Sequence, residues 1–190
     1  MFSLTGMSVV IVIAVLAIAV LLWGIKVYNG LVRLSNLKDE AWSGVDVQLK
    51  RRFDLVPNLV ETVKGYAAHE KATLEKVVAA RSAITSATTQ GGRIAAENTL
   101  TSTLRSLFAV AEAYPDLKAN AGFSQLQTEL SSLENEIQMA RRYYNGTVRE
   151  YNNAIQTFPS VLISRQLGYK EAPFFETDDA SREPVQVKFD

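Results

Sequence analysis

The sequence predicts an all-α protein, in which a single N-terminal transmembrane helix continues into a long kinked helix of an antiparallel helical bundle. One uncharged apolar run lies near the N-terminus, apolar residues then recur every three or four positions, and no stretch alternates as strands do. The 190 residues suffice for one domain with its core. Twenty basic and twenty acidic residues cancel, so we expect no nucleic-acid partner.

The apolar run "MSVVIVIAVLAIAVLLWGI" occupies residues 7–25 and contains no charged residue. At about 1.5 Å per residue it is ~28 Å long, close to the ~30 Å hydrocarbon core of a bilayer. We expect an uncleaved anchor that contacts the lipid bilayer through residues such as Met7, Val12, Leu16, Leu21, Trp23 and Ile25. A cleaved signal peptide is the alternative, but it requires a basic segment before the run, and no Lys or Arg precedes Lys26.

Basic residues follow the run and none precedes it. The positive-inside rule therefore predicts a single-pass protein with residues 1–6 outside and residues 26–170 in the cytoplasm. The tail, residues 171–190, is acidic and contains proline, so we expect it to be partly mobile.

The first helix beyond the run is expected over about 26–87. Apolar residues keep the spacing of a helix stripe from Val45 to Val78, and no glycine turn interrupts them at Pro57. We therefore expect a continuous helix that bends at Pro57, whose missing N–H leaves the carbonyl of Phe53 without its usual donor.

Three shorter helices are expected after it, over about 93–113, 124–158 and 160–167. The segments between them are rich in Gly, Pro, Asn and Asp, which favour turns. Helices of this kind are expected to pack as an antiparallel bundle with coiled-coil-like contacts.

Helix lengths predict self-association. A first soluble helix of about sixty residues would be ~90 Å long, against ~30 Å and ~50 Å for the next two, so these cannot cover it completely. The part nearest the membrane still carries apolar residues, namely Leu31, Leu34, Leu37, Trp42 and Val45. An exposed apolar stripe usually has a partner, so we expect a second copy of the chain, or the tail, to cover it.

Three consecutive basic residues, Lys50, Arg51 and Arg52, are candidates for binding phosphate or lipid headgroups. They would lie ~35–40 Å beyond the bilayer, which is several Debye lengths at cellular salt and disfavours that contact. Arg52 falls within the apolar stripe, so a structural ion pair is the better interpretation. Its carboxylate partner is expected among Glu129, Glu134 and Glu136. Arg52→Leu should then be tolerated, whereas Arg52→Ala should destabilise the fold.

The kink supplies a second candidate site, at Pro57, Asn58 and Glu61. A kink exposes a backbone carbonyl that a ligand can use. The simpler interpretation is a bend that fits the long helix to its neighbours.

Three Tyr-Asn pairs supply the third candidate, at residues 28–29, 144–145 and 151–152. Tyr144 and Tyr151 lie seven residues apart, so both belong to one helix face, with Asn145 and Asn152 beside them. They could bind a partner peptide through ring contacts and amide hydrogen bonds. The alternative is a bundle layer in which each polar group finds a buried partner.

Nothing in the sequence supports an enzyme. The chain has no cysteine, and its single histidine, His69, has no nucleophile beside it. One histidine cannot form a di-iron site with paired Glu-x-x-His motifs, and "TQGGR" lacks the lysine of a phosphate-binding loop. We therefore expect no catalytic residue, cofactor or metal.

Several segments resemble the LemA family of bacterial membrane proteins. They are "YNGLV", "AWSGVDVQLKRRFDLVPNLVETVKGYAAHE", "YPDLKANAGFSQLQTEL" and "ARRYYNGTVREYNNAIQTFPS", in that order. The resemblance extends from Met7 to about Phe175 and leaves out the acidic tail. It implies a single-pass protein of the bacterial inner membrane with a helical bundle and no established activity. Family members are often encoded near membrane proteases.

Three functional hypotheses follow. The preferred one is a non-enzymatic membrane-anchored scaffold of the cell envelope that forms homo-oligomers. The second is an adaptor or sensor that presents a client-binding face to a membrane protease or another envelope protein. The third is an undetected hydrolase that depends on His69.

Overall fold

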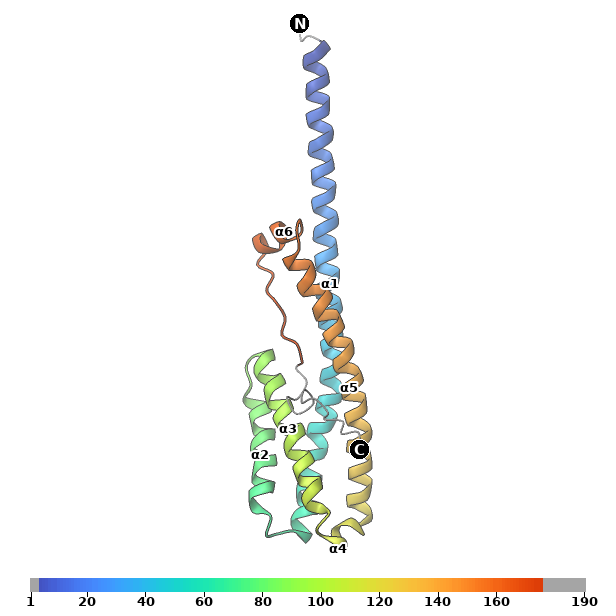
Figure 1. The fold of residues 1–190 in the computed structure, drawn as a ribbon, viewed down its shortest axis with the longest axis vertical. Coiled ribbons are helices and arrows are strands. Elements are labelled where there is room, and N and C mark those ends of the chain that lie inside the picture. Colours follow the sequence, from blue (N-terminus) through green and yellow to red (C-terminus); the bar gives the residue numbers. More distant parts are fainter. Residues whose placement is uncertain (1–3, 176–190) are drawn as a thin grey trace, which may run out of the picture. The chain divides into compact units, whose positions relative to one another are not determined.

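The computed structural model describes residues 4–175, and every regular element in that range is a helix (Figure 1). The helices are α1 (Leu4–Tyr66), α2 (Lys71–Ser86), α3 (Gln90–Ala111), α4 (Pro115–Lys118), α5 (Ala121–Gln156) and α6 (Val161–Gln166). The protein is therefore all-α, with one long N-terminal helix whose first turns are apolar, as the sequence predicted. Residues 176–190 of the tail, and with them most of its expected mobile part, lie outside the described range.

The described chain divides into two compact units. The first contains residues 4–41 and 146–172, and the second contains residues 42–145 and 173–175. Helices α1 and α5 each contribute one part to both units.

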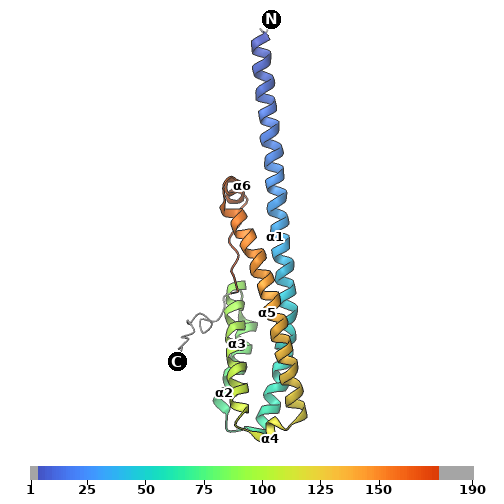
Figure 2. The same ribbon diagram turned by 45° about the vertical axis from the view of Figure 1, so that its right-hand side comes forward.

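The core of the second unit lies among α1, α2, α3 and α5. Helices α2 and α3 pack side by side in both ribbon views (Figures 1 and 2). The buried residues recur at helix spacing on each element, so each helix buries one stripe. Representative members are Val56, Leu59 and Val63 of α1, Val77 of α2, Leu100, Leu104 and Leu107 of α3, and Phe123 and Leu130 of α5.

The expected single helix over 26–87 is wrong. Helix α1 ends at Tyr66, the chain turns through residues 67–70, and α2 is a separate helix. The turn is held by hydrogen bonds from the Glu70 N–H to the Ala67 carbonyl at 3.0 Å and from the Tyr114 hydroxyl to Glu70 Oε1 at 2.9 Å. Because α2 folds back on the same core, the apolar pattern continues, but its phase shifts by one residue. Val77 is buried, whereas Val78, which a single helix would bury, is 49% exposed.

Helix α1 continues through Pro57, as predicted. The Phe53 carbonyl, which loses its usual donor to the proline, accepts a hydrogen bond at 3.3 Å from Nε of Arg81 on α2. The neighbouring helix thus supplies the donor that the proline removes.

The remaining helices lie close to the expected ranges. The helix expected over 93–113 is α3, which begins three residues earlier, where the Thr89 hydroxyl accepts a hydrogen bond from the Gly92 N–H at 3.1 Å. The segment expected to be a loop before α5 contains the four-residue helix α4, which begins at Pro115. The short helix expected over 160–167 is α6.

The apolar stripe at the membrane end of the soluble part of α1, from which we expected self-association, is covered within one chain. Leu31 and Val45 are buried, and Leu34, Leu37 and Trp42 are half-buried within one chain. At Trp42 the expected fold-back of the tail supplies the cover, since the ring of Phe175 stacks on it.

Candidate functional site: a socket for an extended segment

Asn145 of α5 binds the backbone of an extended segment near the end of the described chain. Its Nδ2 donates to the carbonyl of Phe175 at 2.8 Å, and its Oδ1 accepts from the Phe175 N–H at 2.9 Å. The adjacent Tyr144 hydroxyl donates to the Pro173 carbonyl at 2.9 Å and accepts from Nε2 of Gln90 at 3.0 Å. These bonds involve only main-chain atoms of the segment, so they recognise an extended peptide whatever its side chains.

The Phe175 ring fills a socket in the second unit. It stacks on Trp42 of α1 with ring centroids 5.6 Å apart and meets Tyr144 edge-on at 5.8 Å. The guanidinium carbon of Arg141 lies 4.6 Å from the centre of the ring. Phe175 is buried there, whereas its neighbour Phe174 remains exposed. The socket therefore selects one aromatic side chain, and the asparagine fixes the backbone that carries it.

The second Tyr-Asn pair repeats this chemistry within the first unit. Nδ2 of Asn152 donates to the Ala172 carbonyl at 3.0 Å, and its Oδ1 accepts from the Ala172 N–H at 2.9 Å. The Tyr151 hydroxyl donates to the Lys170 carbonyl at 2.9 Å. Burial, followed by the nearby Tyr169 and Asp39, raises the pKa of Tyr151 above its ordinary value. The Tyr151 hydroxyl therefore stays protonated and can donate its hydrogen bond to the Lys170 carbonyl.

The sequence placed these tyrosines and asparagines on one helix face but left two roles open. The second role describes the structure: Tyr144, Tyr151 and Asn152 are buried, Asn145 is half-buried, and their polar groups bind an extended segment of the same chain. Binding of a partner peptide stays a prediction. The first pair, at 28–29, lies on α1 with Tyr28 about half exposed. The occupying segment was missed because it lies about 20 to 30 residues downstream and has no helix period.

Arg52 forms a buried ion cluster, as the apolar position suggested. Its NH2 lies 2.6 Å from Oε2 of Glu97, and its NH1 lies 2.9 Å from Oε2 of Glu134 and 2.7 Å from the Thr101 hydroxyl. Arg52 and Glu97 are each only 1% exposed. Glu134 was among the expected partners, whereas Glu136 pairs with Arg51 instead, at 3.1 Å.

Glu97 was missed, and the sequence contained a signal for it. Like Arg52, it occupies an apolar stripe position, three residues before Leu100 and three after Ile94, both of which are buried. Because Glu97 is fully buried, Arg52→Leu alone would leave a carboxylate without its cation. The expected tolerance of that substitution is therefore withdrawn.

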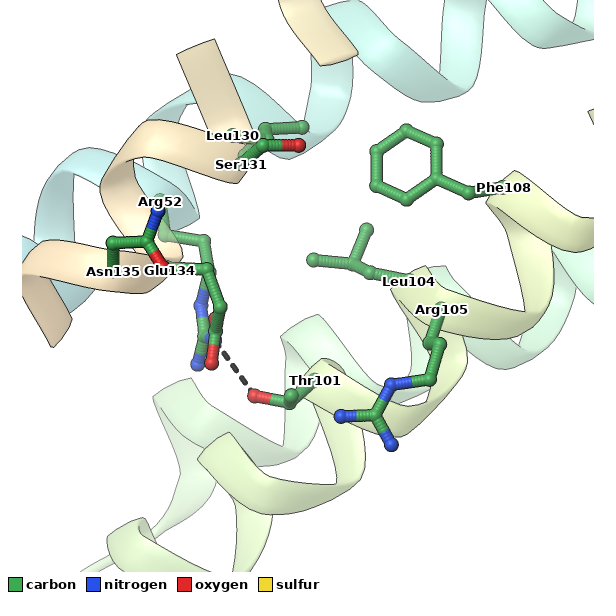
Figure 3. A pocket seen from close by; sticks show the side chains of 9 residues that line it. All are labelled: Arg52, Thr101, Leu104, Arg105, Phe108, Leu130, Ser131, Glu134 and Asn135. Atoms are coloured by element: carbon green, nitrogen blue, oxygen red, sulfur yellow. Dashed lines mark hydrogen bonds and ion pairs between the residues drawn. The ribbon is translucent and has the colours of Figure 1, made fainter. Parts of the chain in front are cut away.

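A groove of about 330 Å³ opens beside this cluster (Figure 3). It is lined by Arg52, Thr101, Leu104, Arg105, Phe108, Leu130, Ser131, Glu134 and Asn135. The Arg52 charge that faces it is already shared between two carboxylates, so Arg52 is not a free cation for an anion in the groove.

The kink residues do not converge on a ligand site. Pro57 is half-buried, while Asn58 and Glu61 are exposed. The Asn58 carbonyl accepts a hydrogen bond from the Thr62 hydroxyl at 2.8 Å, and Glu61 forms a long ion pair of 3.8 Å with Lys64. His69 is exposed in the turn after α1, and residues 4–175 contain no group of three or more His, Cys, Asp or Glu side chains that could hold a metal ion.

The apolar end of α1 has the properties of a membrane span. Within the described residues, α1 is the single helix long and apolar enough to cross a membrane, with a mean hydropathy of 3.0 in its most apolar window. None of that window is buried in the protein. The predicted anchor residues Val12, Leu16 and Leu21 are all exposed, as lipid-facing residues would be.

The LemA family model matches residues 41–189, so the match includes the tail that the resemblance left out and begins after the apolar run. The chain is 28% identical to Protein LemA of Metamycoplasma hominis over 84% of this chain and 73% of that protein. It is 27% identical to Magnetosome protein MamQ 2 of Paramagnetospirillum magneticum over 83% of this chain and 68% of that protein. Magnetosome protein MamQ of Magnetospirillum gryphiswaldense is 25% identical over the same shares.

These matches and the apolar helix together indicate a membrane-associated protein of unclear role, and none of them assigns a catalytic activity. Because the family model covers most of the chain, the protein belongs to the LemA family.

Proposed function

We propose that this protein is a non-enzymatic, membrane-anchored scaffold of the bacterial inner membrane. One observation carries the proposal. Helix α1 runs without a break from an exposed apolar segment into residues such as Leu31 and Val56 that are buried among other helices. The helix that would cross the lipid bilayer therefore also contributes buried residues to the folded units.

Membrane anchoring is tested by extraction of the full chain. Val12→Glu with Leu16→Glu places two charges in the apolar run, each costing about 2.5–3.5 kcal/mol at a bilayer centre. We expect wild type to stay with the membrane fraction after alkaline carbonate and the double variant to be released. Val47→Glu changes an equally exposed valine of the same helix outside the run and should behave as wild type. Release of wild type by carbonate would contradict the anchor.

The proposed orientation has the N-terminus outside and the bundle in the cytoplasm. It is supported by the basic residues after the run, beginning with Lys26. The chain contains no cysteine, so single-cysteine variants report sidedness without background. A cysteine at Val78 should resist an impermeant thiol reagent in intact cells and react after lysis. Labelling in intact cells would reverse the orientation.

Self-association of the scaffold needs a surface other than the apolar stripe of α1 that the chain covers itself. The apolar run is the surface we propose, since helices in lipid associate by packing of their sides. Mass measurement of the full chain in detergent and in nanodiscs should give a multiple of the 21.0 kDa chain. A single chain per particle at every concentration would reject the homo-oligomer and leave the anchor intact.

A second candidate function is an adaptor, favoured by the Phe175 socket. The socket has the parts of a peptide-binding site, and the segment that fills it is linked to it by main-chain bonds and one ring. A client with an exposed aromatic residue on an extended segment could compete for the same groups. Membrane proteases and other envelope proteins are the proposed clients.

The adaptor is tested with a socket emptied by substitution. Phe175→Ala should increase binding of a peptide spanning residues 170–176, followed by the change in Trp42 fluorescence. Phe174→Ala alters the neighbouring exposed ring and should leave the socket filled. Equal and negligible peptide binding by both variants would reject the adaptor.

A further inference from the structure

The corner that follows α5, residues 157–170, exposes large apolar side chains. Phe158 is 79% exposed, more than any other large hydrophobic residue in the described part of the chain, including those of the apolar run. Leu162 and Leu167 are 58% and 49% exposed. We name this set, residues 157–170 of the first unit, the α6 corner.

The α6 corner is held in place by one buried and one partly buried hydrogen bond. The Ser164 hydroxyl is buried and donates to the Ile155 carbonyl at 2.7 Å, and the Ser160 hydroxyl donates to the Ala154 carbonyl at 2.6 Å. Helix α6 ends at Gln166, and two residues later Gly168 has a φ of 72°, a conformation that side chains disfavour. Phe158 and Leu162 are therefore displayed on an ordered backbone. Large apolar side chains gathered in one place, unlike single exposed ones, are typical of an interaction surface.

The α6 corner lies near the membrane end of the first unit. Lys38 Nζ of α1 lies 4.9 Å from the centre of the Tyr151 ring of α5, and the two helices run in opposite directions. Five residues on, Gln156 is ~7.5 Å closer to the apolar run and about level with Arg33. The chain then continues into α6, which lies beside the part of α1 just beyond the apolar run in both ribbon views (Figures 1 and 2). The headgroup layer, about 5–7 Å thick on each side of the hydrocarbon, is within reach.

The charges of the α6 corner are of one sign. It carries Arg165 and Lys170, both exposed, and no acidic residue occurs from Tyr151 to Lys170. Lys26, at the end of the apolar run on α1, is also exposed. Basic residues beside exposed apolar ones match the anionic headgroups and acyl boundary of a membrane surface.

We propose that the α6 corner is a second membrane contact, in which Phe158, Leu162 and Leu167 enter the headgroup region and Arg165 and Lys170 face anionic lipid phosphates. The inference rests on the proposed anchor, because only an inserted α1 brings the corner to the bilayer. It fixes the first unit to the surface at two points, the span and the corner.

The test uses spin labels on single cysteines, which the cysteine-free chain allows. Full-length Leu162→Cys, Met139→Cys and Val12→Cys are labelled and placed in nanodiscs of zwitterionic lipid with or without anionic phosphatidylglycerol. Met139 is as exposed as Leu162 but belongs to the second unit, and Val12 reports the span. We expect the ratio of collision with oxygen to collision with a water-soluble nickel chelate to be at least threefold higher at 162 than at 139.

Two further variants separate the two parts of the contact. Phe158→Ser in the Leu162→Cys background should lower the ratio toward that at 139, since it removes the neighbouring apolar anchor. Arg165→Gln with Lys170→Gln should lower it in anionic discs and leave it unchanged in zwitterionic ones.

The second contact is overturned if the label at 162 is as accessible to the nickel chelate as the label at 139 in both kinds of disc. If the label at 12 still lies in lipid, the anchor is unaffected. A water-exposed label at 12 overturns the anchor and the inference together.

Discussion

The side chain of Arg81 on α2 completes the backbone of α1 at Phe53. Its Nε donates to the Phe53 carbonyl at 3.3 Å, and its guanidinium carbon lies 3.8 Å from the centre of the Phe53 ring. Pro57, four residues later, has no N–H to offer that carbonyl. Arg81 of α2 thus supplies the one hydrogen-bond donor that α1 lacks at Pro57. The same contact holds α2 against α1.

This relationship predicts a coupling between Arg81 and Pro57. Arg81→Ala should lower the free energy of unfolding by about 1–2 kcal/mol, from one hydrogen bond and one cation–ring contact. In a Pro57→Ala background the restored N–H can serve the carbonyl, so the same substitution should cost about 1 kcal/mol less. Denaturant unfolding in detergent of the wild type, the two single variants and the double variant measures this coupling energy.

The matched control is Lys76→Ala, which removes an exposed cation from the same helix and should change stability by less than about 0.5 kcal/mol. Additive effects of the Arg81 and Pro57 substitutions would show that the side chain does not replace the missing donor.

The buried ion cluster predicts strong non-additivity. Arg52→Met leaves Glu97 buried without its cation and should cost about 3–5 kcal/mol. Arg52→Met combined with Glu97→Leu should cost less than either single change, since no buried charge is then left unpaired. Arg51→Ala, which breaks the exposed pair with Glu136, should cost below about 1 kcal/mol. Thermal or denaturant unfolding decides, and a double variant as unstable as the sum of its singles would count against the cluster.

The asparagine clamp predicts local loosening of the tail segment. Asn152→Ala removes both hydrogen bonds to Ala172, each worth about 1 kcal/mol, so exchange of the Ala172 amide should accelerate roughly tenfold or more. Asn153→Ala, the exposed neighbour, should leave that amide protected. Hydrogen exchange followed by mass spectrometry or NMR gives the rates. Unchanged protection in Asn152→Ala would mean that other contacts hold the segment.

Tyr151 predicts a loss of stability at alkaline pH. Its pKa is raised in the folded protein, chiefly by burial, so the folded state holds the phenol proton more tightly than the unfolded state does. The stabilisation is complete below the ordinary pKa of 10.0 and falls as pH rises above it. Tyr151→Phe should flatten the fall in stability above pH 10.0. The exposed Tyr143→Phe is the control, and identical pH profiles of the two variants would contradict the assignment.

Helical phase was the part of the fold that the sequence predicted well. The stripe positions Val45, Leu49, Val56 and Val63 are all buried, because a single face of α1 meets the core. The turn at residues 67–70 could not be read from the same signal. A helix that folds back on one core keeps apolar residues at nearly the same spacing, and a shift of one position, from Val78 to Val77, is within the tolerance of the pattern.

The site residues divide in the same manner. The ion pair of Arg52 was predicted, because a charge in an apolar stripe needs a partner. Glu97 occupies the same kind of position, but it was not recognised as the partner. The spacing of Asn145 and Asn152 showed that they share one helix face. Their main-chain partners at Phe175 and Ala172 could not be predicted, because an extended segment has no periodicity that relates it to a distant helix. The exposure of Phe158 depends on where the chain turns, which composition does not specify.

The Asn152 clamp fixes one register for the chain that returns from α6 within the first unit. Both of its hydrogen bonds engage the main chain of Ala172, and the Tyr151 hydroxyl donates to the main-chain carbonyl of Lys170. Substitutions of the exposed side chains of Lys170 and Glu171 leave these three bonds in place, because only main-chain atoms of the returning segment take part in them. One residue inserted or deleted between Lys170 and Ala172 would move one of the two positions out of register, so the length of this stretch should be under stronger selection than its sequence.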